Sequence, residues 1–225
     1  MGIGTCRGNV VAVAVAAMVS SVALAQTATP PSLLRPLAGA EVDWSAGTVT
    51  ASAGAAADMR MPSPDAARPG AERRARAAAV EKLRAALRAL CVRGRERLGE
   101  KAVETALAHA SAVRTEYQSN GGVVLWLGVR FNQIGAVARE PVAATGALAA
   151  FSVHSMPLEL APLVVLGGKE MAVPHAQYRQ ERPPADAIKV RRDDQGRLVL
   201  PAGGEGMLDR LAERPVVIYL EKVLP

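Results

Sequence analysis

The sequence predicts an α+β fold in which a pair of helices packs on an antiparallel sheet and a β-rich part follows. The first observation is the helical spacing of small and apolar side chains over residues 71–90. The second is a pair of strand-like segments, residues 111–118 and 123–131, joined by the turn-forming sequence Ser-Asn-Gly-Gly. The third is the series of short strand signals after residue 135.

The predicted helix at residues 71–90 has two different faces. Its arginines, at positions 73, 76, 84 and 88, lie largely away from the apolar side, and we interpret them as a solvated surface. A binding face for anionic polymers is the alternative. A second helix is predicted over residues 96–110. The apolar face of the first helix consists of Ala75, Ala79, Leu83, Ala86, Leu87 and Leu90.

The strand predicted at residues 123–131 is nearly continuous in apolar side chains, which predicts a central strand covered on both faces. The second half of the chain has weaker signals. We expect a turn at residues 192–197 and one or two helical turns at residues 207–212. The later predicted strands are residues 148–153, 163–166, 187–190, 198–200 and 216–223.

The first 25 residues have the three parts of a cleavable secretory signal peptide. Arg7 gives a positive start, residues 10–24 are almost wholly apolar, and Ala23-Leu24-Ala25 is the small-x-small pattern that signal peptidase accepts. The apolar run is shorter than the roughly 20 residues of a membrane-spanning helix, although an uncleaved anchor is the alternative. We therefore expect a periplasmic or secreted protein that begins at Gln26, and no later segment predicts a membrane span.

The expected division of the chain follows from these signals. Residues 1–25 are the signal peptide, residues 26–41 form a proline-rich tether, and residues 42–135 form the α+β domain. A proline-containing loop is expected at residues 58–70, before the first helix. Residues 136–225 form the β-rich C-terminal part, either in the same domain or as a second small one.

Charge and composition bear on the partners. Removal of residues 1–25 takes away one arginine and no acidic residue, so the net charge falls from +6 to +5. The charge is spread along the chain, and aromatic residues make up only 3% of it, which argues against stacking platforms for single-stranded nucleic acids. We expect no nucleic-acid partner.

The sequence predicts no catalytic, cofactor-binding or metal-binding residues. His109, His154 and His175 lie far apart and do not have the spacing of a zinc site. Gly167-Gly168-Lys169 lacks the other residues of a phosphate-binding loop, and Asp193-Asp194 lacks the spaced ligands of a calcium loop, so both predict turns. A dispersed triad of a hydrolase leaves no such local pattern and stays an alternative.

One cysteine, Cys91, remains after the expected cleavage. A single thiol cannot form an internal disulfide. Because Cys91 follows Leu83, Leu87 and Leu90 on the predicted helix, we expect a buried core thiol. An intermolecular disulfide is the alternative.

Residues 41–131 resemble a domain shared by the LPP-twenty lipoprotein family and the N-terminal part of the flagellar T-ring assembly protein. The resemblance lies in a strand, a loop, an alanine-rich helix that starts from an Ala-Arg pair, and a later apolar strand. It implies a small sheet with a long helix packed on it, and a non-enzymatic role in envelope or flagellar assembly. Position 26 is Gln rather than the lipobox Cys of that family. The matching positions are Trp44, Gly47, Gly54, Ala67, Arg68, Ala75, Ala79 and Leu83.

These observations predict an exported, non-enzymatic interaction or structural protein of the bacterial envelope, and the resemblance implies a link to motility. A small sheet leaves edge strands, so an envelope protein partner could bind by adding a strand. The alternatives are an envelope hydrolase with a dispersed active site and a binder of anionic polymers. The partner's identity, the oligomeric state, the role of Cys91 and any association with the outer membrane stay open at this point.

Overall fold

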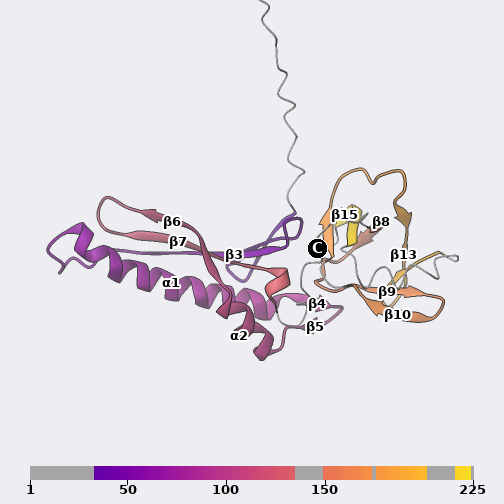
Figure 1. The fold of residues 1–225 in the computed structure, drawn as a ribbon, viewed down its shortest axis with the longest axis horizontal. Coiled ribbons are helices and arrows are strands. Elements are labelled where there is room, and N and C mark those ends of the chain that lie inside the picture. The colour runs from indigo at the N-terminus through magenta and orange to yellow at the C-terminus, as the bar shows by residue number, and fades with distance from the viewer. Residues whose placement is uncertain (1–32, 135–148, 174–175, 202–215, 224–225) are drawn as a thin grey trace, which may run out of the picture.

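The computed structural model describes residues 33–134, 149–173, 176–201 and 216–223, and all structural statements refer to these residues. It confirms the predicted α+β fold with a β-rich C-terminal part (Figure 1). The two α-helices are α1 (Pro64–Ala89) and α2 (Glu100–Ala108), and a short 3₁₀ helix, η1, spans Phe131–Gln133.

A five-stranded antiparallel sheet forms the first part of the molecule. Its spatial order is β1-β2-β3-β7-β6, and each neighbouring pair runs antiparallel. Helix α1 lies along one face of this sheet, mainly against β3 and β7 (Figure 1). The strands are β1 (Leu34–Leu37), β2 (Ala40–Asp43), β3 (Thr48–Ala55), β6 (Ser111–Tyr117) and β7 (Val123–Arg130).

The core between α1 and the sheet matches the predicted helical face. Ala75, Ala79 and Leu83 are fully buried on α1, opposite buried side chains such as Ala51 of β3 and Leu127 of β7. Because alanine has a small side chain, the helix can lie close to the sheet. The predicted helix-on-sheet packing is therefore confirmed at the residues that predicted it.

Helix α1 begins seven residues earlier than residue 71, so the loop predicted at residues 58–70 is wrong in its second half. Ser63 is the N-cap, and its hydroxyl accepts a hydrogen bond from the backbone N–H of Ala66 at 3.3 Å. Pro64 occupies the first helical position, where a missing N–H costs no helical hydrogen bond. The prolines that suggested a loop therefore accompany the start of the helix.

The second helix is shorter than predicted, because residues 96–99 are not part of it. Two short antiparallel strands, β4 (Cys91–Arg93) and β5 (Glu96–Arg97), come between the helices. Gly94, with a φ of 57°, makes the tight turn between them. Strand β5 and the residues after it therefore replace the first turn of the helix predicted at residues 96–110.

The tether predicted at residues 26–41 is wrong from residue 34 onward. Strands β1 and β2 form a hairpin whose two central residues, Ala38 and Gly39, have φ values of 48° and 85°. Positive φ at both positions is the backbone conformation of the tight two-residue hairpin turn. Pro36 does not exclude a strand here because β1 is an edge strand. Residues 26–32 lie outside the described part of the chain.

Strand β7 is central as predicted, but it is covered on one face only. Val123, Leu125 and Leu127 point toward α1 and are buried. Val124 and Trp126, on the opposite face, are half-buried. The prediction of a doubly covered strand is therefore wrong, and the other face of the sheet forms part of the surface.

The C-terminal part contains two four-stranded sheets. One has the order β11-β15-β8-β12, and all of its neighbouring strands are parallel. The other has the order β10-β9-β14-β13. The strands are β8 (Ala149–Met156), β9 (Leu163–Leu166), β10 (Lys169–Ala172), β11 (Gln177–Arg179), β12 (Ile188–Lys189), β13 (Arg191–Arg192), β14 (Leu198–Val199) and β15 (Val216–Val223).

The strands predicted in the second half are confirmed in substance, whereas β10, β11 and β13 were not predicted. The Gly167-Gly168 turn joins β9 to β10, and both glycines have positive φ. The turn predicted at residues 192–197 is also confirmed, because the Asp193 carboxylate accepts the backbone N–H of Arg197 at 2.8 Å. The helical turns predicted at residues 207–212 lie outside the described residues.

The two parts of the molecule share one continuous buried core. The backbone N–H groups of Leu160 and Ala161 donate to the carbonyls of Cys91 and Val92 at 3.0 and 2.9 Å, so the C-terminal part continues the backbone pairing of β4. Within the described ranges, no helix is long and apolar enough to cross a membrane.

Candidate functional site

The outer edge of β6 is the most prominent uncovered element of the sheet. It is the last strand in the order β1-β2-β3-β7-β6, and its backbone pairs with β7 alone among the described residues. Six of its seven residues are exposed. They include two large apolar side chains, Val113 at 66% and Tyr117 at 56% exposure. The β6–β7 hairpin extends away from the C-terminal part (Figure 1).

The backbone groups that this edge presents follow from the hairpin turn. The N–H of Gln118 donates to the carbonyl of Gly122 at 2.8 Å, so Gln118 directs its hydrogen-bonding groups toward β7. Hydrogen-bonded and non-hydrogen-bonded positions alternate along an antiparallel pair. Glu116 therefore also faces β7 with its backbone, whereas Thr115 and Tyr117 direct their N–H and carbonyl groups outward.

The hairpin that carries this edge is held against the start of α1. A Cβ atom on Gly121 would lie 2.6 Å from the carbonyl oxygen of Pro64, closer than real contacts allow. Gly121 also has a φ of 84°. Position 121 therefore requires glycine for two reasons, namely its backbone conformation and its close approach to the helix. The tip of the hairpin therefore lies directly against the first turn of α1.

Two charged side chains of β6 lie on the face of the sheet opposite α1. The Arg114 guanidinium lies 4.8 Å from the ring centroid of Trp126 and forms an ion pair with Glu116. On the helix side, Arg68 of α1 lies 5.8 Å from the centroid of the Tyr117 ring. Cation–π contacts of this kind hold the aromatic rings in place at a modest gain in free energy.

Strand β6 contains an irregularity at Val113. Its register to β7 shifts between Ala112 and Arg114, which leaves Val113 as the extra residue of a bulge. Val113 then covers Gly128, because a Cβ atom on that glycine would lie 2.6 Å from the Val113 Cγ2 atom. The bulge leaves the regular part of the exposed edge at residues 114–117.

The face of the sheet opposite α1 also contains a shallow depression of about 460 Å³ next to the β1–β2 hairpin. Trp126 forms one wall, and the hydroxyl-bearing side chains of Thr50 and Ser52 lie beside it. Glu41 and Pro36 are on the opposite side. The depression is open to solvent and lacks a cluster of convergent polar groups.

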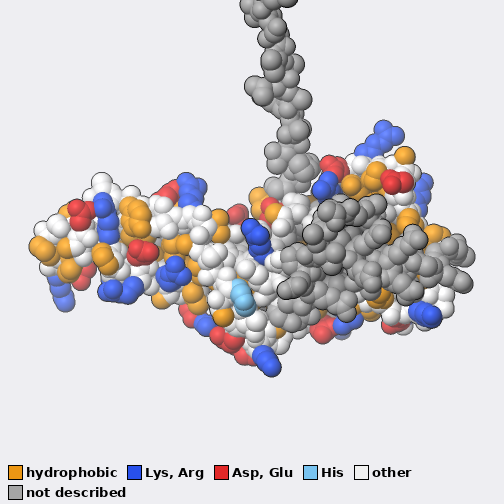
Figure 2. All heavy atoms as spheres, viewed as in Figure 1, with side chains coloured by type: hydrophobic (Ala, Val, Ile, Leu, Met, Phe, Trp, Pro, Cys, Tyr) orange, Lys and Arg blue, Asp and Glu red, His pale blue; other side chains and the backbone are white. Residues whose placement is uncertain are grey.

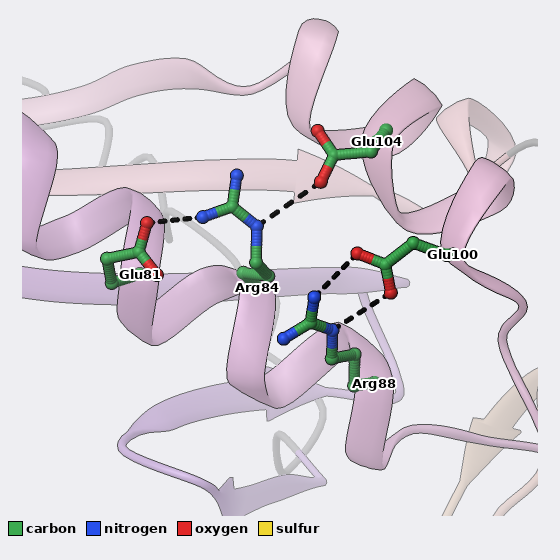
Figure 3. A network of polar contacts seen from close by, with 5 residues as sticks. All are labelled: Glu81, Arg84, Arg88, Glu100 and Glu104. Carbon is green, nitrogen blue, oxygen red and sulfur yellow. Dashed lines mark hydrogen bonds and ion pairs between the residues drawn. The ribbon is translucent and has the colours of Figure 1, made fainter.

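Two of the four arginines of the predicted arginine face of α1, Arg84 and Arg88, form ion pairs with neighbouring carboxylates (Figure 3). Arg84 pairs with Glu81 on its own helix and with Glu104 of α2 at 3.3 Å. Arg88 binds Glu100 of α2 through two nitrogens, and its hydrogen bond lowers the pKa of the Glu100 carboxyl. These pairs connect α1 to α2.

On the face of the molecule drawn in Figure 2, the surface charge is mixed rather than of one sign. Figure 2 shows basic and acidic side chains interspersed over the part of the molecule that contains α1 and the five-stranded sheet. Arg73 and Arg76 are exposed on α1, but Glu72 lies next to them on the same helix. This distribution does not form the continuous basic face that an anionic polymer would require.

The histidines do not converge. His109 caps the end of α2, where its Nδ1 atom lies 2.8 Å from the carbonyl oxygen of Thr105. His154 pairs with Glu221 at 2.6 Å across β8 and β15, but both side chains are exposed, and no described hydroxyl or thiol bonds to the other ring nitrogen. His175 lies outside the described residues. Three or more metal-ligating side chains do not gather anywhere in the described ranges.

Cys91 begins β4 rather than lying on the helix, and it is half-buried rather than a core residue. Its thiol donates to the carbonyl of Gly94 at 3.1 Å. Burial raises the pKa of the thiol, which keeps it protonated and weakly nucleophilic. The prediction of a fully buried core thiol is therefore wrong in its degree of burial.

Sequence reasoning missed a buried carboxylate at the junction of the two parts. Glu159 is 5% exposed and accepts the backbone N–H of Gly94 at 2.8 Å. Its backbone carbonyl accepts the hydroxyl of Tyr178 at 2.8 Å, and the Tyr178 ring packs edge-on against Trp44. Burial raises the pKa of the Glu159 carboxyl. A single glutamate between apolar segments has no sequence pattern that predicts this position.

Comparison with known proteins gives no match to a protein-family model and none to a curated protein. The resemblance of residues 41–131 to the LPP-twenty and T-ring domains therefore stays a prediction.

Proposed function

We propose that this chain is an exported, non-enzymatic interaction protein of the bacterial envelope, and that it binds its partner at the outer edge of β6. The signal-like residues 1–25 support export. The resemblance to domains with roles in envelope and flagellar assembly supports the choice of an interaction protein.

The open edge of β6 carries the proposal. Thr115 and Tyr117 present outward backbone groups, which an added strand would satisfy. Proteins usually protect such edges with proline, charged side chains, β-bulges, a short strand or a covering segment. Strand β6 has the bulge at Val113 and two charged residues, but its regular part at residues 114–117 has no proline, and no described segment covers it. Exposed apolar side chains at Val113 and Tyr117 would also gain from contact with a partner.

The two alternative functions have weaker support. A hydrolase would need a nucleophile beside an oriented base. The exposed pair of His154 and Glu221 offers a base with no nucleophile beside it in the described residues. A binder of anionic polymers would need a continuous set of free arginines. Arg84 and Arg88 are paired with carboxylates, and the exposed Arg73 and Arg76 have Glu72 beside them on the helix.

The experiment is chemical cross-linking in intact cells, followed by purification of the tagged chain from the envelope fraction. The matched variants are Thr115→Pro, which removes an outward N–H, and Thr115→Val, which keeps it. We expect one defined cross-linked species for the original chain and for Thr115→Val, and at least a tenfold loss, roughly, for Thr115→Pro. N-terminal sequencing of the same sample tests cleavage before Gln26.

The proposal is contradicted if no defined cross-linked species forms under several conditions, or if Thr115→Pro leaves its yield unchanged. It is also contradicted if the chain remains in the cytoplasmic fraction. Circular dichroism of both variants controls for folding, because a proline at an outward-facing edge position removes no bond to β7.

A further inference from the structure

We infer that the partner of the β6 edge is a second copy of this chain, which pairs antiparallel through its own β6 about a twofold axis at Thr115. This inference rests on the proposed function, because it uses the same edge and specifies what binds there. The resulting dimer would continue the two five-stranded sheets into one sheet. Dimers with twofold symmetry place the same surface of each copy in contact, so the edge must be complementary to itself.

The backbone geometry allows Thr115 as the centre. In an antiparallel pair, two directly opposed residues exchange both hydrogen bonds when their backbone groups face each other. Thr115 directs its N–H and carbonyl groups away from β7, so two copies of Thr115 can exchange both bonds on the axis. A pairing centred on Glu116 would place Thr115 of one copy opposite Tyr117 of the other, and their outward groups could also exchange hydrogen bonds. The choice between these two registers therefore depends on the side chains.

The charges of Arg114 and Glu116 select the register with Thr115 on the axis. With Thr115 on the axis, Arg114 of one copy lies opposite Glu116 of the other, and the same contact recurs on the other side of the axis. Both side chains are on the face of the sheet opposite α1, where they already form an ion pair within one copy. Directly opposed opposite charges stabilise an antiparallel pair, whereas like charges destabilise it.

The registers centred one residue to either side of Thr115 oppose like charges. A pairing centred on Arg114 would place the two Arg114 guanidinium groups opposite each other. A pairing centred on Glu116 would place the two Glu116 carboxylates opposite each other. Charged residues on an edge usually discourage association. Here the order Arg114-Thr115-Glu116 disfavours the registers centred on Arg114 or Glu116 and favours the register centred on Thr115. The same charges therefore set the specificity of the pairing.

The helix side leaves room for the second copy. Helix α1 packs mainly against β3 and β7 rather than beneath β6. The side chain of Thr115 lies on this side and would meet the Thr115 of the other copy, and threonine pairs are favourable across antiparallel strands. Tyr117, 56% exposed, lies on the same side and would lose exposed apolar surface.

Charge-exchange variants test the inference directly. Arg114→Glu opposes two carboxylates at both ends of the pairing, and Glu116→Arg opposes two guanidinium groups. A mixture of the two variants restores an opposite charge at each contact. Neither substitution changes a buried side chain. The chain is purified from the envelope fraction, and its mass in solution is measured by sedimentation at several concentrations, with circular dichroism as the folding control.

We expect the original chain to dimerise, each variant alone to associate at least about tenfold more weakly, and the equimolar mixture to recover the dimer. A monomeric original chain, or a mixture that associates no better than its components, overturns the inference. A different result distinguishes failure of the self-pairing from failure of the proposed function. If the purified chain is monomeric but Thr115→Pro still abolishes a cross-link to a different envelope protein, the edge binds another partner and only the self-pairing is wrong.

Discussion

Strands β1 and β6 are the two edges of one sheet, and they differ in how they meet the solvent. The two-residue turn at Ala38-Gly39 makes Leu37 and Ala40 a hydrogen-bonded pair, so the next residue, Pro36, occupies an outward-facing position. Proline has no N–H to offer there. Strand β6 has outward N–H groups at Thr115 and Tyr117. Pro36 therefore removes one of the outward N–H groups of the short strand β1, which leaves that of Leu34. We call the β1 edge closed and the β6 edge open in this sense.

The closed edge is also the one that joins the rest of the molecule. Trp44 directly follows β2, and its backbone N–H donates to the carbonyl of Leu33 at 3.1 Å. Its carbonyl accepts the N–H of Tyr178 at 3.3 Å, and its ring packs against Phe131 and Tyr178. One side of the sheet therefore serves internal packing, which leaves β6 available for another molecule.

We expect the greatest loss of stability from Leu83→Ala, because Leu83 belongs to the core that packs α1 against the sheet and so stabilises both of its edges. Leu83 is fully buried between α1 and the sheet. The substitution leaves a cavity, so we expect the free energy of unfolding to fall by about 2–5 kcal/mol, as measured by chemical denaturation. Arg73→Ala, on the exposed side of α1, is the control and should change it by less than about 0.5 kcal/mol. Equal effects would contradict the described packing.

Two prolines on β6 test which backbone groups face outward. Glu116→Pro removes an N–H that bonds to Val124 of β7, so we expect the free energy of unfolding to fall by about 1–3 kcal/mol. Thr115→Pro should have a much smaller effect on stability and still abolish pairing at the edge. Thermal unfolding and sedimentation of both variants give the comparison. The assignment of outward-facing backbone groups on β6 is wrong if Thr115→Pro lowers the free energy of unfolding more than Glu116→Pro does.

The closed edge can be opened by Pro36→Thr, which adds an outward N–H. Loss of proline should lower the free energy of unfolding by about 0.4–1 kcal/mol through the unfolded chain. In a Thr115→Pro background, where β6 cannot pair, we expect measurable new self-association by sedimentation. Because β1 has only four residues, it should be weaker than that of the original β6. A strictly monomeric double variant would show that Pro36 does not close the edge.

The smallest effect is expected from Glu159→Gln, which acts on the junction and should leave β6 unchanged. Burial raises the folded-state pKa of Glu159, so the folded state favours the neutral carboxyl. Its stabilising contribution is full below the unfolded pKa of about 4.3 and is lost as pH rises through the folded pKa. Glutamine keeps an acceptor for Gly94 without the charge.

We therefore expect the melting temperature of Glu159→Gln to exceed that of the original chain at pH 7, with a difference that shrinks as pH falls toward about 4.3. The melting temperature of each chain is measured from pH 4 to 8. A pH-independent difference, or a variant that is less stable at neutral pH, would show that the carboxylate is not penalised by burial. The self-association of the variant, measured by sedimentation, should equal that of the original chain.

The sequence predicts the local patterns well and the long-range pairings poorly. The apolar face around Ala79 and Leu83, and the hairpin around Gly121, are visible because each is set by residues close in the chain. The start of α1 was missed because proline is compatible with both a loop and a first helical turn. Strand β1 was missed because only the sheet order shows that Pro36 lies on an edge.

The candidate site was predictable in kind but not in place. A small sheet must have edges, so strand addition could be expected before the structure was known. Which edge is open depends on the strand order and on the alternation of backbone groups, neither of which a single sequence specifies. Likewise, Glu159 is buried only because β4 from the first part meets residues 159–161 of the second.

Amide hydrogen exchange at Thr115 and Tyr117 tests the open edge most directly, because these two N–H groups are the ones said to face outward. We predict fast exchange for both in the dilute monomer, and protection that increases with protein concentration as β6 pairs. The amide of Glu116 should be protected throughout by its bond to β7. Slow exchange of Thr115 and Tyr117 at every concentration, or fast exchange at every concentration, would contradict the account.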